Sequence, residues 1–298
     1  MTKSRPLERA RLSAILAALC FSTGGAAIKA TVLDGFQVAS FRSGVAALCL
    51  ALFLPATRAR WTWRAALVGL AYASTMVLFV TSNKLTTAAN TIFLQSSAPL
   101  YVLLLSPWLL GERVRRSDLF YMAVLALGLG LFFVGVRSPD RLAPNPFLGN
   151  VLAAAAGLAW ALTVFGLRWI AQREPAQGGA RAVLLGNLLA CAGCLPFALP
   201  VRGAHAADAA VIGYLGVVQI GLAYVLLMRA VEHVPALEAS LLLLVEPVLS
   251  PVWAWLVHGE SPGAWSLAGG AVILGATALR TSVDFARARS SPSRPHQA

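Results

Sequence analysis

The chain has 298 residues, of which 58% are hydrophobic and 12% are charged, and its mean hydropathy is +0.72. A soluble domain carries about twice this fraction of charged residues, so a soluble enzyme or a soluble binding module is excluded. The net charge of +12 suggests nucleic-acid binding, but the basic residues lie in short segments between apolar stretches. Membrane topology and anionic lipids explain such a pattern, and we expect no nucleic-acid partner.

Ten apolar stretches follow one another along the chain, each long enough for a membrane-spanning helix of about 20 residues. In chain order they are Leu12–Ile28, Phe36–Pro55, Ala65–Asn83, Leu85–Gly111, Leu119–Val136, Leu142–Leu167, Ala182–Val201, Ala209–Met228, Ala236–Val257 and Ser261–Leu279. The second contains Arg42, the ninth contains Glu238 and Glu246, and the others contain no charged residue. Because backbone groups in lipid must be satisfied within the chain, these stretches predict an all-α polytopic membrane protein with ten transmembrane helices.

The basic residues predict how the chain is oriented in the membrane. With the N-terminus in the cytoplasm, 18 of the 24 basic residues fall on the cytoplasmic side, 5 fall on the opposite side and Arg42 lies within a span. The positive-inside rule therefore predicts a multi-pass protein of the plasma (inner) membrane with both termini in the cytoplasm. Residues 282–298 are rich in Ser, Pro and Arg, and we expect them to form a disordered cytoplasmic tail.

The two halves of the chain repeat the same motifs at nearly constant spacing. The matched pairs are Ala98-Pro99-Leu100 with Glu246-Pro247-Val248 and Gly111-Glu112 with Gly259-Glu260, at an offset of 148, and Lys29 with Arg168, at an offset of 139. We expect a first five-helix repeat at 1–143 and a second at 144–281. Because five is odd, the second copy enters the membrane from the opposite side and the repeat is inverted. Inverted repeats are a recurring architecture of secondary transporters.

Several of these motifs also resemble a known family. They are Gly69-Leu70-Ala71-Tyr72, Ser97-Ala98-Pro99-Leu100, Leu110-Gly111-Glu112-Arg113, Gly221-Leu222-Ala223-Tyr224, Leu244-Val245-Glu246-Pro247-Val248 and His258-Gly259-Glu260. Together they resemble the two repeats of the EamA-type transporters of the drug/metabolite transporter (DMT) superfamily, in which an arginine also tends to stand where this chain has Arg42. The resemblance implies export of amino acids, metabolites or drugs, and one branch of the family exports aromatic amino acids.

Charged residues within the spans are candidates for function because their burial is costly. Arg42 can bind the carboxylate of an amino acid through its forked guanidinium, or it forms a structural ion pair. Glu246 is a candidate for proton coupling, and the alternatives are a fixed pair with Arg42 or a hydrogen bond to a neighbouring helix. Pro99, Pro107, Pro247 and Pro251 are expected to kink the fourth and ninth helices at equivalent points. Such kinks either hinge alternating access or are static bends.

Aromatic and amide side chains within the spans supply a second set of candidates. Rings can stack on the apolar body of a solute while amides and hydroxyls meet its polar groups. The alternatives are an aromatic belt at the membrane interface and lipid-facing bulk. The predicted substrate-binding residues, besides Arg42, are Tyr72, Phe79, Tyr101, Trp160, Gln219 and Tyr224.

The chain lacks the sequence motifs of ATP-driven transporters and of membrane enzymes. None of its three lysines stands in a Walker-type loop, and no nucleophile with its base or metal motif is recognisable. We expect no enzyme, no cofactor and no metal. The hypothesis is a secondary transporter or facilitator that exports small organic solutes, above all amino acids including aromatic ones, by alternating access at a midplane site, with or without proton coupling. The alternatives are a broad metabolite or drug exporter and, from another class, a membrane sensor or intramembrane enzyme.

Overall fold

The computed structural model describes residues 4–58, 60–109, 116–134, 136, 138–174, 178–231, 233–234 and 236–290. Its helices are α1 (Ser4–Ser22), α2 (Gly24–Lys29), α3 (Gly35–Phe53), α4 (Trp63–Leu85), α5 (Ala88–Gln95), α6 (Ala98–Leu109), α7 (Arg116–Val134), α8 (Pro146–Ala171), α9 (Gly178–Ala198), α10 (Ala206–Tyr214), α11 (Ala223–Val231), α12 (Ala236–Leu243), α13 (Val245–His258) and α14 (Ala264–Ser290), with the 3-10 turn η1 (Pro55–Arg58) and the π-helical segment η2 (Leu215–Leu222). The described part of the chain contains no strand.

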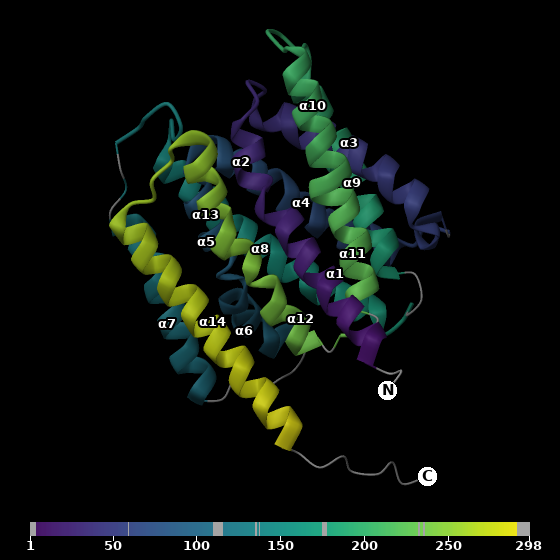
Figure 1. Ribbon diagram of the computed structural model, residues 1–298, viewed down its shortest axis with the longest axis vertical. Coiled ribbons are helices and arrows are strands. Elements are labelled where there is room, and N and C mark those ends of the chain that lie inside the picture. Colours follow the sequence, from purple (N-terminus) through teal and green to yellow (C-terminus); the bar gives the residue numbers. More distant parts are fainter. Residues whose placement is uncertain are drawn as a thin grey trace.

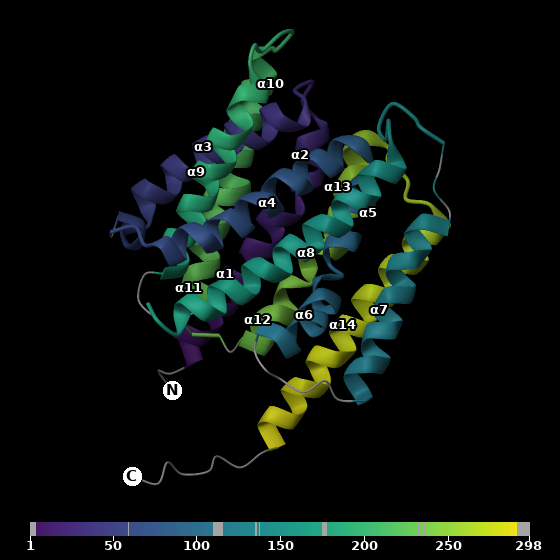
Figure 2. The ribbon, with the colours of Figure 1, turned by 180° about the vertical axis from the view of Figure 1, so that it is seen from behind.

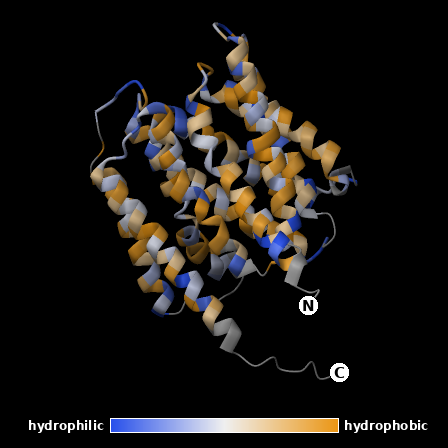
Figure 3. Ribbon diagram, viewed as in Figure 1, coloured by the Kyte–Doolittle hydropathy of each residue, from blue (hydrophilic) through white to orange (hydrophobic). Residues whose placement is uncertain are grey.

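These helices build ten spans that are long and apolar enough to cross a membrane, as the sequence predicted. Their bounds are Leu7–Lys29, Gly35–Phe53, Trp63–Leu85, Ala88–Trp108, Arg116–Val134, Pro146–Ala171, Gly178–Ala198, Ala206–Ala230, Leu241–His258 and Ala264–Ala286. The beginning of α1 and the end of α14 lie at the same end of the bundle (Figure 1), and hydrophobic residues dominate the helices between its two ends (Figure 3). We call the end that holds α1's beginning the termini end and the other the opposite end.

Short polar segments set where the spans begin. Asp34 accepts a hydrogen bond from the Gln37 backbone N–H while the Gln37 side chain accepts one from Asp34, a capping box that starts α3. Thr62, Thr87 and Asn145 cap α4, α5 and α8 in the same way, each through its side-chain oxygen. The apolar runs are therefore separated by residues that satisfy the first free N–H groups of the next helix.

Two spans are interrupted at matching positions. The fourth span breaks at 96–97, between α5 and α6, and the ninth breaks at Leu244, between α12 and α13. These breaks coincide to within one residue at the offset of 148. Pro99 and Pro247 follow them, inside the first turns of α6 and α13, where the missing N–H of proline costs little. The helical runs α5–α6 and α12–α13 are thus each divided into two shorter helices.

The contacts between helices recur when each span is replaced by the span five places later in the chain, which is its counterpart in the other repeat. The contact of α4 with α8 has its counterpart in that of α1 with α11, α4 with α9 in α3 with η2, and α5 with α8 in α1 with α12. The pairs of α3 with α9 and of α7 with α14 are their own counterparts. In two opposite views α7 and α14 lie side by side at one edge (Figure 1, Figure 2).

The last helix extends beyond its expected end. We expected disorder from residue 282, but α14 continues as a helix through Ser290, and residues 291–298 lie outside the described residues. The Arg280 guanidinium pairs with Asp284 at 3.1 Å on the same helix and with Asp118 of α7 at 2.6 Å. Residues 284–289 also favour a helix because they include two alanines and two arginines, whereas the Ser and Pro residues that suggested disorder, apart from Ser282, begin only at Ser290.

Glycine allows α4 and α9 to lie in close contact. A Cβ atom added at Gly186 would lie 2.5 Å from Tyr72 Cδ1 and 2.8 Å from the Gly69 carbonyl oxygen. Real atoms do not approach so closely, so a larger residue would push the two helices apart. Small residues serve this purpose commonly between membrane helices.

We therefore expect Gly186→Ala to destabilise the protein by about 1–3 kcal/mol, the usual effect of overpacking. The matched control is Gly193→Ala on the same helix, where an added Cβ meets nothing within 4 Å and the effect should stay within about 1 kcal/mol. Thermal unfolding of both variants in detergent micelles measures the difference. Equal melting temperatures would contradict the close contact of α4 and α9.

Candidate functional site

A cluster of polar side chains lies inside the bundle, where α3, α4 and η2 meet. Arg42 of α3 is 1% exposed. Its guanidinium donates hydrogen bonds to Gln219 Oε1 at 3.3 Å and to the Met76 carbonyl oxygen at 3.3 Å, and the Met76 sulfur lies 3.6 Å away. Gln219 of η2 is also buried, so a cation and an amide face each other in the protein interior.

Two tyrosines complete this cluster. The rings of Tyr72 on α4 and Tyr224 on α11 pack edge to face, with their centroids 5.7 Å apart, and both are buried. Tyr72 lies about one turn before Met76 on α4, and the Met76 carbonyl oxygen accepts from Arg42. Phe21 of α1 packs against Tyr224 with centroids 5.2 Å apart, and the Asn187 amide donates to the Tyr72 hydroxyl at 3.4 Å. Three packed aromatic rings therefore lie beside one buried positive charge.

The π-helical segment brings Gln219 to this position. A Cβ at Gly216 would lie 2.5 Å from Val45 Cβ, so η2 approaches α3 only because this residue is glycine. A Cβ at Gly24, at the start of α2, would lie 2.8 Å from Gln219 Nε2. Widened π turns inside α-helical spans occur often at functional sites, and here the widened turn carries the residue that contacts Arg42.

The Arg42 charge has no carboxylate partner in the part of the chain that the structure describes. Its Nε atom is buried without a hydrogen-bond partner. The ion pair with Glu246 that the sequence left open is therefore not formed among these residues. Buried charges are ordinarily paired because desolvation is costly, so Arg42 is an exception to this rule within the described ranges.

Glu246 lies close to the same cluster. It stands in the first turn of α13, where the helix dipole favours a negative charge, and it lies within electrostatic reach of Tyr224. Within the described ranges its carboxylate forms neither an ion pair nor a hydrogen bond to another side chain. Pro247 follows it and is buried, whereas Pro99 occupies the equivalent place at the start of α6.

Three predicted binding residues lie outside this cluster. Phe79 of α4 lies two turns beyond Tyr72 and packs in a separate apolar cluster with Phe93. Tyr101 of α6 packs on α8, with its Cε2 atom 3.2 Å from the place of a Cβ at Gly157. Trp160 lies one turn further along α8 and is half-buried. The structure thus brings together Arg42, Tyr72, Gln219 and Tyr224, while Phe79, Tyr101 and Trp160 make no described contact with Arg42.

A buried ion pair joins the two halves of the chain at the opposite end. Lys29 Nζ lies 3.4 Å from Glu260 Oε2, and the two side chains are 4% and 2% exposed. Nζ also donates to the backbone carbonyls of Thr86, at 2.8 Å, and Leu142, and Glu260 Oε1 accepts from the Ala88 N–H at 2.7 Å. These two side chains connect α2, the start of α5 and the loops before α8 and after α13.

Ion pairs at the termini end are more exposed. Arg11 of α1 pairs with Glu238 of α12, and the two side chains are 45% and 17% exposed. The pair of Arg280 with Asp118 is 29% and 9% exposed. Water screens such pairs more strongly than the buried pair at the opposite end. Among the described residues, no group of three or more His, Cys, Asp or Glu side chains could hold a metal ion.

Comparison with known proteins agrees with this architecture. The profile of the EamA-like transporter family matches residues 9–134 and 147–282. The chain belongs to the EamA-like transporter family. An uncharacterized transporter of Archaeoglobus fulgidus is 31% identical over 200 residues, which cover 67% of this chain and 69% of that protein. A solved structure, described as the crystal structure of a protein, covers 95% of this chain with a TM-score of 0.61 and 22% identity, which shows similarity of fold.

Some residues of the polar cluster and of the buried ion pair were not among the predicted binding residues. Met76 contributes a backbone carbonyl, which residue type does not reveal. Asn187 and Phe21 contact the tyrosines from the seventh and first spans, and their relation to Tyr72 and Tyr224 is purely spatial. Lys29 and Glu260 did carry a signal, because both belong to the repeated motifs, but the repeat does not indicate that they pair with each other.

We expect the Lys29–Glu260 pair to stabilise this transporter strongly. Breaking a buried pair from one side leaves an uncompensated charge, so Lys29→Met and Glu260→Gln should each cost about 3–5 kcal/mol. The double variant should cost clearly less than the sum of the two, because it leaves no charge behind. Unfolding of the four proteins in micelles, arranged as a double-mutant cycle, measures the coupling.

The control is the same cycle for Arg11→Met and Glu238→Gln. This more exposed pair should give a coupling of about 1 kcal/mol or less. Equal couplings in the two cycles would contradict the expectation that burial strengthens the Lys29–Glu260 pair.

Proposed function

We propose that this chain is a secondary transporter or facilitator that exports small organic solutes with a carboxylate group, above all amino acids including aromatic ones. One observation carries the proposal, namely the buried Arg42 guanidinium that has no carboxylate partner among the described residues. A carboxylate solute would supply the missing charge through a forked, charge-assisted contact. The Tyr72 and Tyr224 rings beside it provide an apolar and aromatic face for the body of the solute.

Two inverted repeats, 1–143 and 144–281, support alternating access as the mechanism. The family profile matches the chain twice, two spans break at equivalent positions, and the helix contacts are related by exchange of the repeats. Half-helices that start near the middle of the membrane are typical of transporter binding sites. In this mechanism the two repeats rock about the Arg42 cluster, and solute moves down its gradient.

The orientation follows from the distribution of charge. Counting basic residues places the termini end in the cytoplasm of the plasma (inner) membrane, so the Lys29–Glu260 pair closes the outer side. Export then requires this pair to separate when the outer side opens. Glu112, the repeat counterpart of Glu260, lies outside the described residues.

The alternative function is export of a broad range of metabolites or drugs. The aromatic packing around Tyr224 favours it, because rings accept many apolar solutes without regard to their charge. The two functions differ in whether the Arg42 charge selects the substrate. Flux of phenylalanine, phenylalaninol and a cationic dye, measured in liposomes that contain the purified protein, separates them.

We expect Arg42→Met to lower phenylalanine flux about 10- to 100-fold more than phenylalaninol flux, since a hydrogen bond to a charged group contributes about 1.5–3 kcal/mol. Arg42→Lys should lie between the wild type and Arg42→Met, because it keeps the charge but not the forked geometry. The melting temperature of each variant serves as the control for folding. Equal loss of both fluxes by a folded Arg42→Met protein would rule out carboxylate recognition, and dye flux alone would identify a drug exporter.

Glu246 is the proposed site of proton coupling. If its carboxylate carries the proton, flux by the wild type responds to a pH gradient and flux by Glu246→Gln does not, because the amide cannot titrate. Glu238→Gln on the same span is the matched control and should keep the response, since Glu238 pairs with Arg11 at the termini end. A Glu246→Gln protein that keeps the response of the wild type would assign Glu246 a structural role only.

A further inference from the structure

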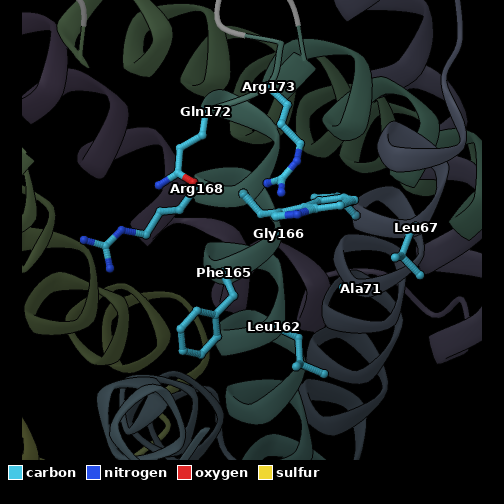
Figure 4. A pocket seen from close by; sticks show the side chains of 10 residues that line it. Leu67, Ala71, Leu162, Phe165, Gly166, Arg168, Gln172 and Arg173 are labelled. Carbon is cyan, nitrogen blue, oxygen red and sulfur yellow. The ribbon is translucent and has the colours of Figure 1, made fainter. Parts of the chain in front are cut away.

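A groove lies between α4 and α8 at the termini end of the bundle, apart from the Arg42 cluster. It encloses about 860 Å³. Figure 4 shows the side chains that line it, with Leu67 of α4 on one side and Leu162, Arg168 and Arg173 along the α8 side. None of the residues that contact Arg42 lines this groove, so it is separate from the proposed transport site.

The groove is apolar along one part and cationic along the other. Leu67 is 56% exposed and Leu162 is 41% exposed, so both face outward from the bundle within spans that are surrounded by lipid. Arg168 lies six residues beyond Leu162, roughly 9 Å further along the helix axis at 1.5 Å per residue. The groove therefore changes from apolar to cationic over about the distance that separates acyl chains from headgroups in a bilayer.

Aromatic stacking holds the Arg173 side chain of the groove in place. The Arg173 guanidinium lies 5.1 Å from the centre of the Trp169 ring, and the Trp63 ring packs against Trp169 with centroids 5.6 Å apart. Tryptophans concentrate at the interface between membrane and water, which places this part of the groove at headgroup depth. Stacking on an aromatic face also fixes a guanidinium without neutralising its charge.

The two arginines of the groove carry uncompensated charge. Arg64 next to them pairs with Glu174 at 3.6 Å. In the part of the chain that the structure describes, neither Arg168 nor Arg173 forms an ion pair with a carboxylate. Two such cations at one end of an apolar groove complement an amphiphile that has an anionic headgroup.

We propose that this groove binds an anionic phospholipid. The phosphate lies between Arg168 and Arg173, where forked guanidinium contacts favour phosphate oxygens, and the Gln172 amide is available as a further donor. An acyl chain follows Leu67 and Leu162 toward the middle of the membrane. Basic pockets between transmembrane helices at the cytoplasmic side are suited to such headgroups.

The test is native mass spectrometry of the full chain released from nanodiscs that contain equal amounts of phosphatidylglycerol and phosphatidylcholine. We expect the wild type to retain phosphatidylglycerol preferentially. The double variant Arg168→Gln/Arg173→Gln should lower the ratio of bound phosphatidylglycerol to bound phosphatidylcholine about tenfold or more, since both guanidinium contacts to the phosphate are lost. The matched control Arg9→Gln/Arg229→Gln removes two exposed arginines of α1 and α11 and should keep the wild-type ratio.

Each outcome decides the proposal. Equal retention of the two lipids by the wild type overturns it, and this measurement needs no variant to fold. A ratio that falls equally in the double variant and its control shows general attraction to the basic end and also overturns it. If the double variant keeps its lipid ratio but loses solute flux, the groove belongs to the solute pathway instead of a lipid site.

Discussion

The absence of water from the bilayer interior constrains every polar group in this protein. Backbone groups are satisfied by ten helical spans, and polar residues at the helix starts, such as Thr62 and Asn145, satisfy the first free N–H groups. Under this constraint a guanidinium buried in the core needs polar partners in place of water. Arg42 receives two neutral acceptors, Gln219 and the Met76 carbonyl, which solvate it partly without neutralising its charge.

Glycine and π-helical geometry make that arrangement possible. Gly186 lets α9 lie against Tyr72, and Gly216 lets η2 lie against α3. Without these close approaches Gln219 and Tyr72 could not both face Arg42 in the same small volume. The small residues that bring the helices together therefore also determine the position of the polar cluster, so packing and site geometry cannot be varied independently here.

The sequence predicts the spans well because apolar length is a strong local signal, and the ten spans in the structure agree closely with those expected. It also predicts bends in the fourth and ninth spans at four prolines. The breaks lie beside two of these, Pro99 and Pro247, whereas Pro107 and Pro251 lie inside α6 and α13. The site is predicted only in part, because residue type indicates which side chains suit a solute but not which of them meet. Phe79 and Tyr72 lie on the same helix, yet two turns separate them, and they belong to different apolar clusters.

The repeat in the sequence does not predict that the two ends of the bundle differ in structure. Lys29 and Arg168 are counterparts at an offset of 139, but Lys29 is buried in an ion pair whereas Arg168 is exposed and lines a groove. Two repeats of similar sequence must adopt unlike surroundings if one side of a transporter is closed while the other is not. The difference between these two cations therefore shows that the two ends of the bundle have unlike surroundings, and under the alternating-access mechanism proposed above the desolvated Lys29–Glu260 contact separates when the outer side opens.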